Sequence, residues 1–130
     1  MVPREFSDVL INLNIEKSDK AIQAAELLIN NGLLESALNR IYYAIFYIVT
    51  ALAEKNDFVT SKHSSLIGWF NKKFIYEEKV FKENIYKIYD KTYKFREKSD
   101  YDPLYHATIE DTNEILAEAK IFIETVRKEI

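Results

Sequence analysis

The sequence predicts an all-α fold, an up-and-down antiparallel bundle of four to five helices that forms one domain over residues 1–130. Composition is the first reason: the chain has only two glycines and two prolines. These residues mark most turns, and an all-β chain needs many turns. Apolar residues make up 48% of the chain, enough for a packed core, and they recur at helical spacing. Long helices joined by short loops favour a bundle.

The first predicted helix runs from Leu13 to Asn31. Its apolar residues recur at helical spacing: Ile15, Ile22, Ala25, Leu28 and Ile29. Residues 5–12 either extend this helix or form a separate turn. The run Asn30–Gly32 predicts its end, because Asn and Gly accept the left-handed conformation that closes a helix.

The second predicted helix, Leu33–Lys55, is apolar on almost every face. Such a helix must be buried on more than one side. In a domain of this size the second covering surface is often another subunit, so we expect a homodimer with this helix near the interface. The longest mostly apolar run, residues 41–53, is shorter than the ~20 residues that a membrane span needs, so we expect no membrane partner.

A loop over residues 56–60 and a short helix, Ser61–Phe74, are expected next. The fourth predicted helix, Glu77–Lys98, turns a group of apolar side chains inward: Val80, Phe81, Ile85, Ile88 and Phe95.

Residues 99–107 are expected to be irregular, because Asp102 precedes Pro103 and a residue before proline is disfavoured in a helix. The last helix is predicted to open with Thr108 as its N-cap and an acidic residue, Asp111, three positions later.

Composition argues against several kinds of site. The chain has no cysteine, which excludes disulfides and thiolate metal sites. It has two histidines and no Glu-x-x-His pattern, so we expect no metal. Gly32 and Gly68 are too far apart for a glycine-rich phosphate loop, so we expect no cofactor. The N-terminus lacks the apolar stretch of a signal peptide, and we expect a cytoplasmic protein.

The segment from Arg96 to Tyr101 is the strongest candidate site. Arg96 can clamp a phosphate through its planar fork, Asp100 can orient Arg96, and Tyr101 offers a phenolic hydroxyl. The alternative is an ordinary ion pair between Arg96 and Asp100, with Tyr101 packed over the end of the helix.

Two further residues are candidates. His63, near the start of a short helix, can serve as a general acid or base, or it can be a capping or surface residue. Arg40 is a charge within an apolar helix, so it needs a partner, either Asp100 or Glu35, or a functional place.

Basic and aromatic residues alternate between residues 72 and 98. Lysines such as Lys94 and Lys98 can contact phosphates, and tyrosines can stack on unpaired bases. Lys94 and Lys98 are therefore candidate nucleic-acid-binding residues, together with Arg40, which lies outside this stretch. Because acidic residues are mixed in, a solvated helix face is the alternative.

Three blocks of the sequence resemble the HEPN-domain family, above all its small stand-alone archaeal and bacterial branch. The string Ser36–Tyr47, SALNRIYYAIFY, is similar to the signature helix of that branch, Ser-Arg-Ala-Tyr-Tyr-Ala-Met/Ile-Phe. Residues 60–64, followed by Phe70, match its Thr/Lys-x-His-Ser segment. Arg96–Tyr101 matches its Arg-x-x-x-Asp-Tyr segment. The resemblance covers about residues 36–130.

The resemblance implies a dimeric HEPN-like helical bundle. Many HEPN proteins are toxins of toxin–antitoxin pairs that cleave RNA without a metal, and their usual partner is a minimal nucleotidyltransferase antitoxin. In ribonuclease-active members, a phosphate-stabilising arginine is followed four to six residues later by a histidine that assists proton transfer.

This chain departs from that motif, because Tyr101 stands where the histidine would be and His106 lies farther on. Tyrosine is a poor general base at neutral pH. The resemblance carries over to Arg96, and the histidine role falls to His63 or His106. Alternatively, the protein binds RNA or nucleotides without cutting. Some related toxins are silenced by nucleotidylation of a tyrosine near the motif, and the resemblance makes Tyr101 or Tyr105 the candidate acceptor here.

Overall fold

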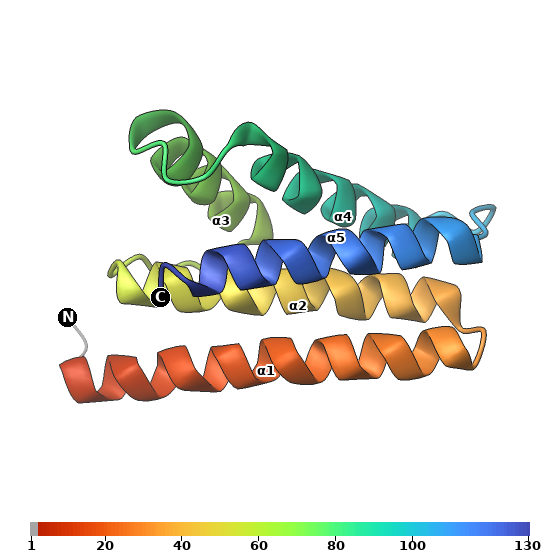
Figure 1. Cartoon of the computed structure of the whole chain (residues 1–130), viewed down its shortest axis with the longest axis horizontal. Helices are drawn as coiled ribbons and strands as arrows, with labels where there is room; N and C mark the ends of the chain where they lie inside the picture. Colours follow the sequence, from red (N-terminus) through yellow and green to blue (C-terminus); the bar gives the residue numbers. More distant parts are fainter. Residues whose placement is uncertain (1–2) are drawn as a thin grey trace.

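The computed structural model describes residues 3–130, and the described part is helical with short connections. Its elements, in chain order, are α1 (Arg4–Asn30), α2 (Leu34–Lys55), α3 (His63–Phe70), the π-helical segment η1 (Asn71–Glu77), α4 (Glu83–Tyr101) and α5 (Ile109–Arg127). The predicted all-α fold is confirmed. α1 and α2 run antiparallel, and α4 and α5 repeat this up-and-down order (Figure 1).

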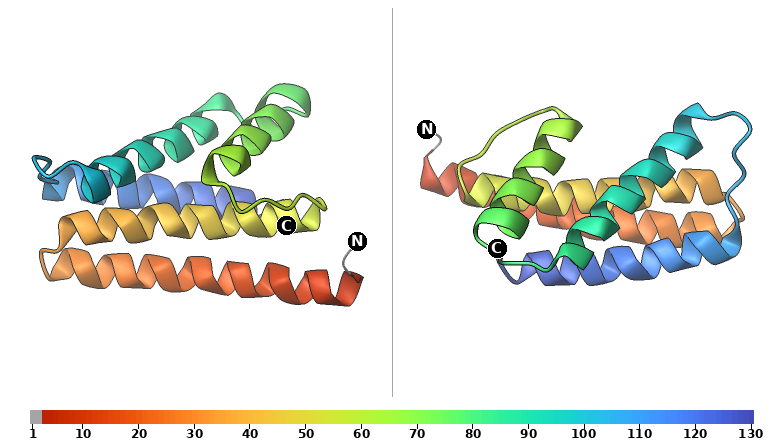
Figure 2. Two further views of the ribbon diagram at one scale, coloured as in Figure 1. Left: turned by 180° about the vertical axis from the view of Figure 1, so that it is seen from behind. Right: turned by 90° about the horizontal axis from the view of Figure 1, so that it is seen from above.

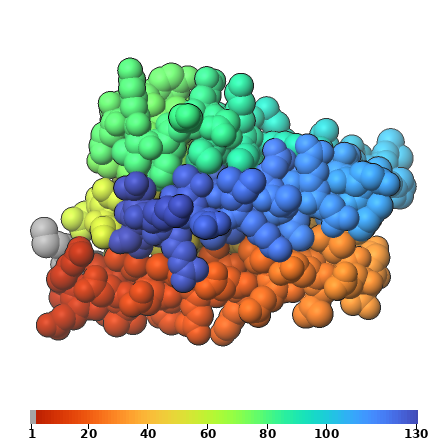
Figure 3. All heavy atoms as spheres, viewed as in Figure 1, coloured from red at the N-terminus to blue at the C-terminus, as the bar shows by residue number. Residues whose placement is uncertain are grey.

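Helix α2 is the centre of the bundle. α1 lies along one side of it and α5 along another, while α3, η1 and α4 cross over its remaining face (Figure 2). In the space-filling view α1 and α5 hide most of α2 (Figure 3). Eleven of its residues are buried: Ala37, Leu38, Ile41, Tyr42, Ala44, Ile45, Ile48, Val49, Ala51, Leu52 and Ala53.

The sequence predicted that α2 is buried on several sides, and the other helices of the same chain provide this burial. The expected second subunit is therefore not needed to explain the apolar surface of α2, and the homodimer stays a prediction. α2 is long and apolar enough to cross a membrane by length and composition, with a mean hydropathy of 1.2 in its most apolar stretch. However, 61% of that stretch is buried inside the bundle, as in the core helix of a folded domain.

Helix α1 begins at Arg4, so residues 5–12 extend the helix instead of forming a turn. They add Ser7 and Ile11 to the buried surface. The helix ends at the predicted position, where Gly32 has a φ of +74°. Glycine accepts this left-handed conformation without steric cost.

The predicted boundaries around α3 and α4 are wrong by several residues. α4 begins at Glu83, not at Glu77, because the amides of Val80 and Phe81 turn back to the carbonyl of Phe74, at 2.8 and 3.2 Å. Val80 therefore lies in a turn and is 38% exposed, whereas the sequence predicted it to face inward.

The connection between α4 and α5 is shorter than predicted, because α4 continues through Tyr101. The helix stops where the sequence requires it: Asp102, before the proline, is extended, with φ −104° and ψ 105°. The predicted cap of α5 is confirmed, since the Thr108 hydroxyl accepts a hydrogen bond from the Asp111 amide at 3.1 Å.

Candidate functional site

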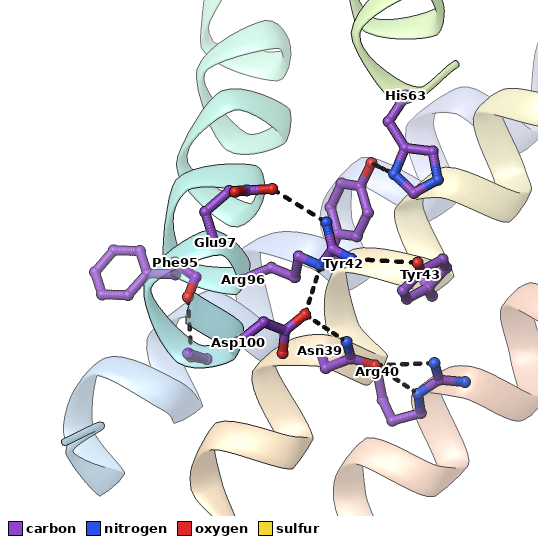
Figure 4. Close-up of polar contacts among 10 residues, drawn as sticks. Asn39, Arg40, Tyr42, Tyr43, His63, Phe95, Arg96, Glu97 and Asp100 are labelled. Carbon is purple, nitrogen blue, oxygen red and sulfur yellow. Dashed lines mark hydrogen bonds and ion pairs between the residues drawn. The ribbon is translucent and has the colours of Figure 1, made fainter. Parts of the chain in front are cut away.

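Arg96 lies on the side of α4 that packs against α2, and its side chain is only 12% exposed. Nη1 donates a hydrogen bond to the Glu97 carboxylate at 3.1 Å, and Nη2 donates one to the Tyr43 hydroxyl at 3.4 Å (Figure 4). Burial alone would lower the pKa of Arg96, but Tyr43 and Asp100 outweigh burial and raise it overall. The guanidinium is therefore a fixed, partly desolvated positive charge.

Asp100 connects Arg96 to α2. It stands one helical turn after Arg96, and its Oδ2 is 2.8 Å from Arg96 Nε. The Nε–H does not point at this oxygen, so the contact is a close ion pair and not a directed hydrogen bond. The same oxygen accepts a hydrogen bond from Asn39 Nδ2 at 3.0 Å. This carboxylate thus fixes the end of α4 against α2.

Tyr101, the third residue of the predicted segment, lies beside Arg96 with its ring centroid 5.8 Å from Cζ. Its side chain does not pack over the end of the helix, because it is 69% exposed. The ion pair of the alternative interpretation does exist, but it belongs to a larger cluster.

His63 joins this cluster from α3. As the first residue of that helix, it places Nδ1 2.9 Å from the Tyr42 hydroxyl, with its ring 4.4 Å from that of Phe46. Arg96 Cζ lies 5.4 Å from the ring of the same Tyr42. His63 is half-buried, and burial, reinforced by the positive charge of Arg96, lowers its pKa below the usual 6.5. At neutral pH the imidazole is therefore uncharged.

Tyr42 and Tyr43 hold these groups together, and the sequence assigned neither a role in the site. Tyr42 is fully buried, and burial raises its pKa above the usual range, so its hydroxyl stays protonated. Tyr43 presents its hydroxyl to Arg96. The only signal in the sequence was the tyrosine pair inside the string that resembles the family signature.

Arg40 has neither of its predicted partners. It donates to the side-chain oxygen of Asn39 from Nε at 3.2 Å and from Nη2 at 2.9 Å, and its Cζ lies 5.0 Å from the Tyr43 ring. Asp100 is already engaged by Asn39, and Glu35 accepts a hydrogen bond from the Ala107 amide at 3.3 Å. The prediction of a direct ion pair for Arg40 was wrong, because the shorter Asn39 side chain stands between Arg40 and Asp100.

The remaining candidates lie outside the cluster. The His106 side chain is 87% exposed, and its one charged neighbour is Glu35, at 3.9 Å. Lys94 pairs with Asp90 at 2.8 Å, and Lys98 lies over the Phe95 ring at 5.3 Å. Of the two histidines, only His63 is near Arg96. Residues 3–130 contain no group of three or more side chains placed to hold a metal ion.

Comparison with known proteins matches residues 11–129 to the HEPN domain. The chain is 35% identical to a "UPF0332 protein" of Thermotoga maritima over 112 residues, 86% of this chain and 84% of the relative. Two similar proteins of Methanocaldococcus jannaschii are named "Putative toxin MJ0142", 32% identical over 88% of this chain and 77% of the relative, and "Putative toxin MJ0605", 34% identical over 88% and 84%.

Proposed function

The chain belongs to the HEPN domain family, and on this premise we propose that it is the toxin of a toxin–antitoxin pair that cleaves RNA without a metal ion. One observation carries the proposal. His63 and Arg96, far apart in sequence, both contact Tyr42. The imidazole of His63 is a hydrogen-bond acceptor, and the guanidinium of Arg96 beside it is a fixed cation. The cluster thus brings together an arginine and a histidine, the two residue types of the family's ribonuclease motif, although this histidine comes from a different helix.

The chemistry that suits these groups is attack of a ribose 2′-hydroxyl on the adjacent phosphorus. A base takes the 2′ proton as the new P–O bond forms, and a cation stabilises the charge that builds on the phosphate oxygens. The bond to the 5′-oxygen breaks, and that oxygen receives a proton from water. The products are a 2′,3′-cyclic phosphate and a 5′-hydroxyl.

His63 is suited to the role of the base. Its lowered pKa keeps it neutral, and in the tautomer that this role requires Nδ1–H donates a hydrogen bond to the Tyr42 oxygen, 2.9 Å away. Among residues 3–130 no side chain or backbone group bonds to Nε2, which is the nitrogen available for proton transfer. Tyr42 serves as a positioning residue, because it sets the direction of the imidazole ring.

Arg96 is suited to binding the phosphate. Its contact to Glu97 involves a carboxylate that is 40% exposed, the more exposed of the two carboxylates at Arg96. A phosphate can therefore replace Glu97 at Nη1, while Asp100 and Tyr43 keep the guanidinium in place. Arginine favours this exchange, because its fork binds phosphate in a bidentate way.

The proposed partners are a second copy of the chain and a minimal nucleotidyltransferase antitoxin. Tyr101 is the better acceptor for nucleotidylation, because it is 69% exposed and beside Arg96. The Tyr105 hydroxyl, by contrast, is buried. A nucleotide on Tyr101 would place negative charge and bulk next to the guanidinium.

The test is incubation of 5′-labelled RNA with purified protein in EDTA. Wild type is expected to release fragments ending in 2′,3′-cyclic phosphate, whereas Arg96→Ala and His63→Ala lose roughly 10²–10³-fold in rate. His106→Ala removes the same side chain outside the cluster and should cleave like wild type. Intact RNA at high protein excess would refute the ribonuclease.

A non-catalytic module that binds RNA or a nucleotide is the second candidate. It is favoured by Tyr101, which stands five residues after Arg96, where the family's ribonuclease motif has a histidine. Binding without cleavage in the same assay, abolished by Arg96→Ala, would support it.

A further inference from the structure

A shallow pocket of about 320 Å³ lies between α1 and α2. Lys17, Lys20 and Arg40 supply its charged groups, Tyr47 forms an aromatic wall, and two small residues, Ala21 and Ala24, leave the space open. All of its charged lining residues are cations, which favours an anionic ligand.

These cations are poorly neutralised within residues 3–130. Arg40 donates only to the amide oxygen of Asn39 and makes no ion pair. Within residues 3–130 Lys17 has no carboxylate partner, and its Nζ lies 5.6 Å from the centroid of the Tyr47 ring. Lys20 has a single, exposed partner, Glu16, at 3.8 Å. The pocket therefore differs from the site of Arg96, whose charge is compensated by two carboxylates.

The pocket and the proposed catalytic cluster each have an arginine that lies against Tyr43. Arg40 and Arg96 both lie against the ring of Tyr43, with Cζ 5.0 and 5.5 Å from its centroid. In Figure 4 Asn39 lies between Arg40 and Asp100. The guanidinium groups of Arg40 and Arg96 are both close to Tyr43. A single nucleic-acid strand can contact both.

We infer that this pocket binds the nucleotide of single-stranded RNA that flanks the phosphate held by Arg96. Lys17 and Arg40 contact its phosphate, and Tyr47 stacks on its base. Cationic grooves with aromatic platforms are the usual means of binding unpaired strands. The inference rests on the proposed function for its choice of substrate, and strand continuity with Arg96 favours an oligonucleotide over a free nucleotide.

The experiment measures binding of a fluorescent 2′-O-methyl oligoribonucleotide, which cannot be cleaved through the 2′-oxygen, by anisotropy over a range of salt concentrations. Lys17→Ala is expected to weaken binding and to reduce the slope of log affinity against log salt by about 0.7, the contribution of one phosphate contact on a single strand. Lys128→Ala, which removes an exposed lysine that does not line the pocket, should leave the slope unchanged.

Stacking is tested separately at Tyr47. Tyr47→Leu should weaken binding roughly 5- to 150-fold, because it removes the aromatic ring on which one base stacks. Tyr47→Phe keeps that ring and should keep most of the affinity. Circular dichroism of each variant verifies the fold. Equal slopes for Lys17→Ala and Lys128→Ala, or equal affinities for Tyr47→Leu and Tyr47→Phe, would overturn the inference.

A competition arm with adenosine monophosphate separates the sources of the ligand. We expect the mononucleotide to compete far less well than the unlabelled oligomer, and equal competition per molecule would overturn the proposed strand path. The two proposals fail in different ways. Pocket variants that leave binding unchanged in a protein that cleaves RNA refute only the pocket. Wild-type protein that binds the oligomer through Lys17 and Tyr47 but never cleaves RNA refutes only the ribonuclease.

Discussion

Two buried tyrosines provide a stability test in which one chemical change has opposite effects. Tyr89 is fully buried, its ring packs 5.6 Å from those of Phe70 and Phe122, and its hydroxyl has no hydrogen-bond partner within residues 3–130. An unsatisfied buried polar group costs about 1–3 kcal/mol. Tyr89→Phe keeps the ring and removes only that group, so it should raise the free energy of unfolding by about 1 kcal/mol or more.

Tyr42→Phe is the matched control, because Tyr42 is equally buried but its hydroxyl is hydrogen-bonded to His63 at 2.9 Å. It should lower the free energy of unfolding by about 0.5–1.5 kcal/mol. Urea titrations followed by circular dichroism measure both changes, provided that the slope of free energy against urea is the same in all three proteins.

In a thermal scan each kcal/mol corresponds to about 3–5 °C in Tm for a chain of this size. Destabilisation by Tyr89→Phe would refute the reasoning, since it would mean that the hydroxyl has a partner in solution, such as a buried water.

Three other predictions follow from the site and the caps. Glu97→Gln removes the exposed carboxylate that competes with phosphate at Arg96, so it should tighten RNA binding several-fold at low salt, and weaker binding would contradict the proposed exchange. Because burial and then Arg96 lower the pKa of His63, the neutral base is populated at neutral pH. The cleavage rate should therefore rise with pH to a plateau reached through a pKa below 6.5, and this rise should vanish in the residual activity of His63→Ala. Thr108→Ala removes the cap of α5 and should cost about 1 kcal/mol of stability in a urea titration, whereas Thr108→Ser should cost little.

The cluster also explains why local sequence patterns found part of the site and missed the rest. Arg96 and Asp100 are one helical turn apart, so their contact follows from helix geometry alone. The contact of His63 with Tyr42 joins two helices across a loop. No periodicity within either segment determines it, because it depends on where α3 crosses α2.

Arg40 illustrates the same limit. The sequence offered Arg40 a partner, Asp100 or Glu35, or a functional place, and neither of the two carboxylates pairs with it. The choice of partner was decided by distance in three dimensions, where the Asn39 amide comes between Arg40 and Asp100.

The sequence by itself determined the helical class, the burial of the helix at residues 33–55 on more than one side, the cap at Thr108 and the break before Pro103. Each of these depends on neighbours within a few turns of one helix. Only the tertiary structure decided that α1, α4 and α5 cover α2 within one chain. It also decided that η1 delays the start of α4, and that His63 instead of His106 lies beside Arg96. These features depend on how helices cross and pack, and packing between distant segments leaves no periodic trace in the order of residues.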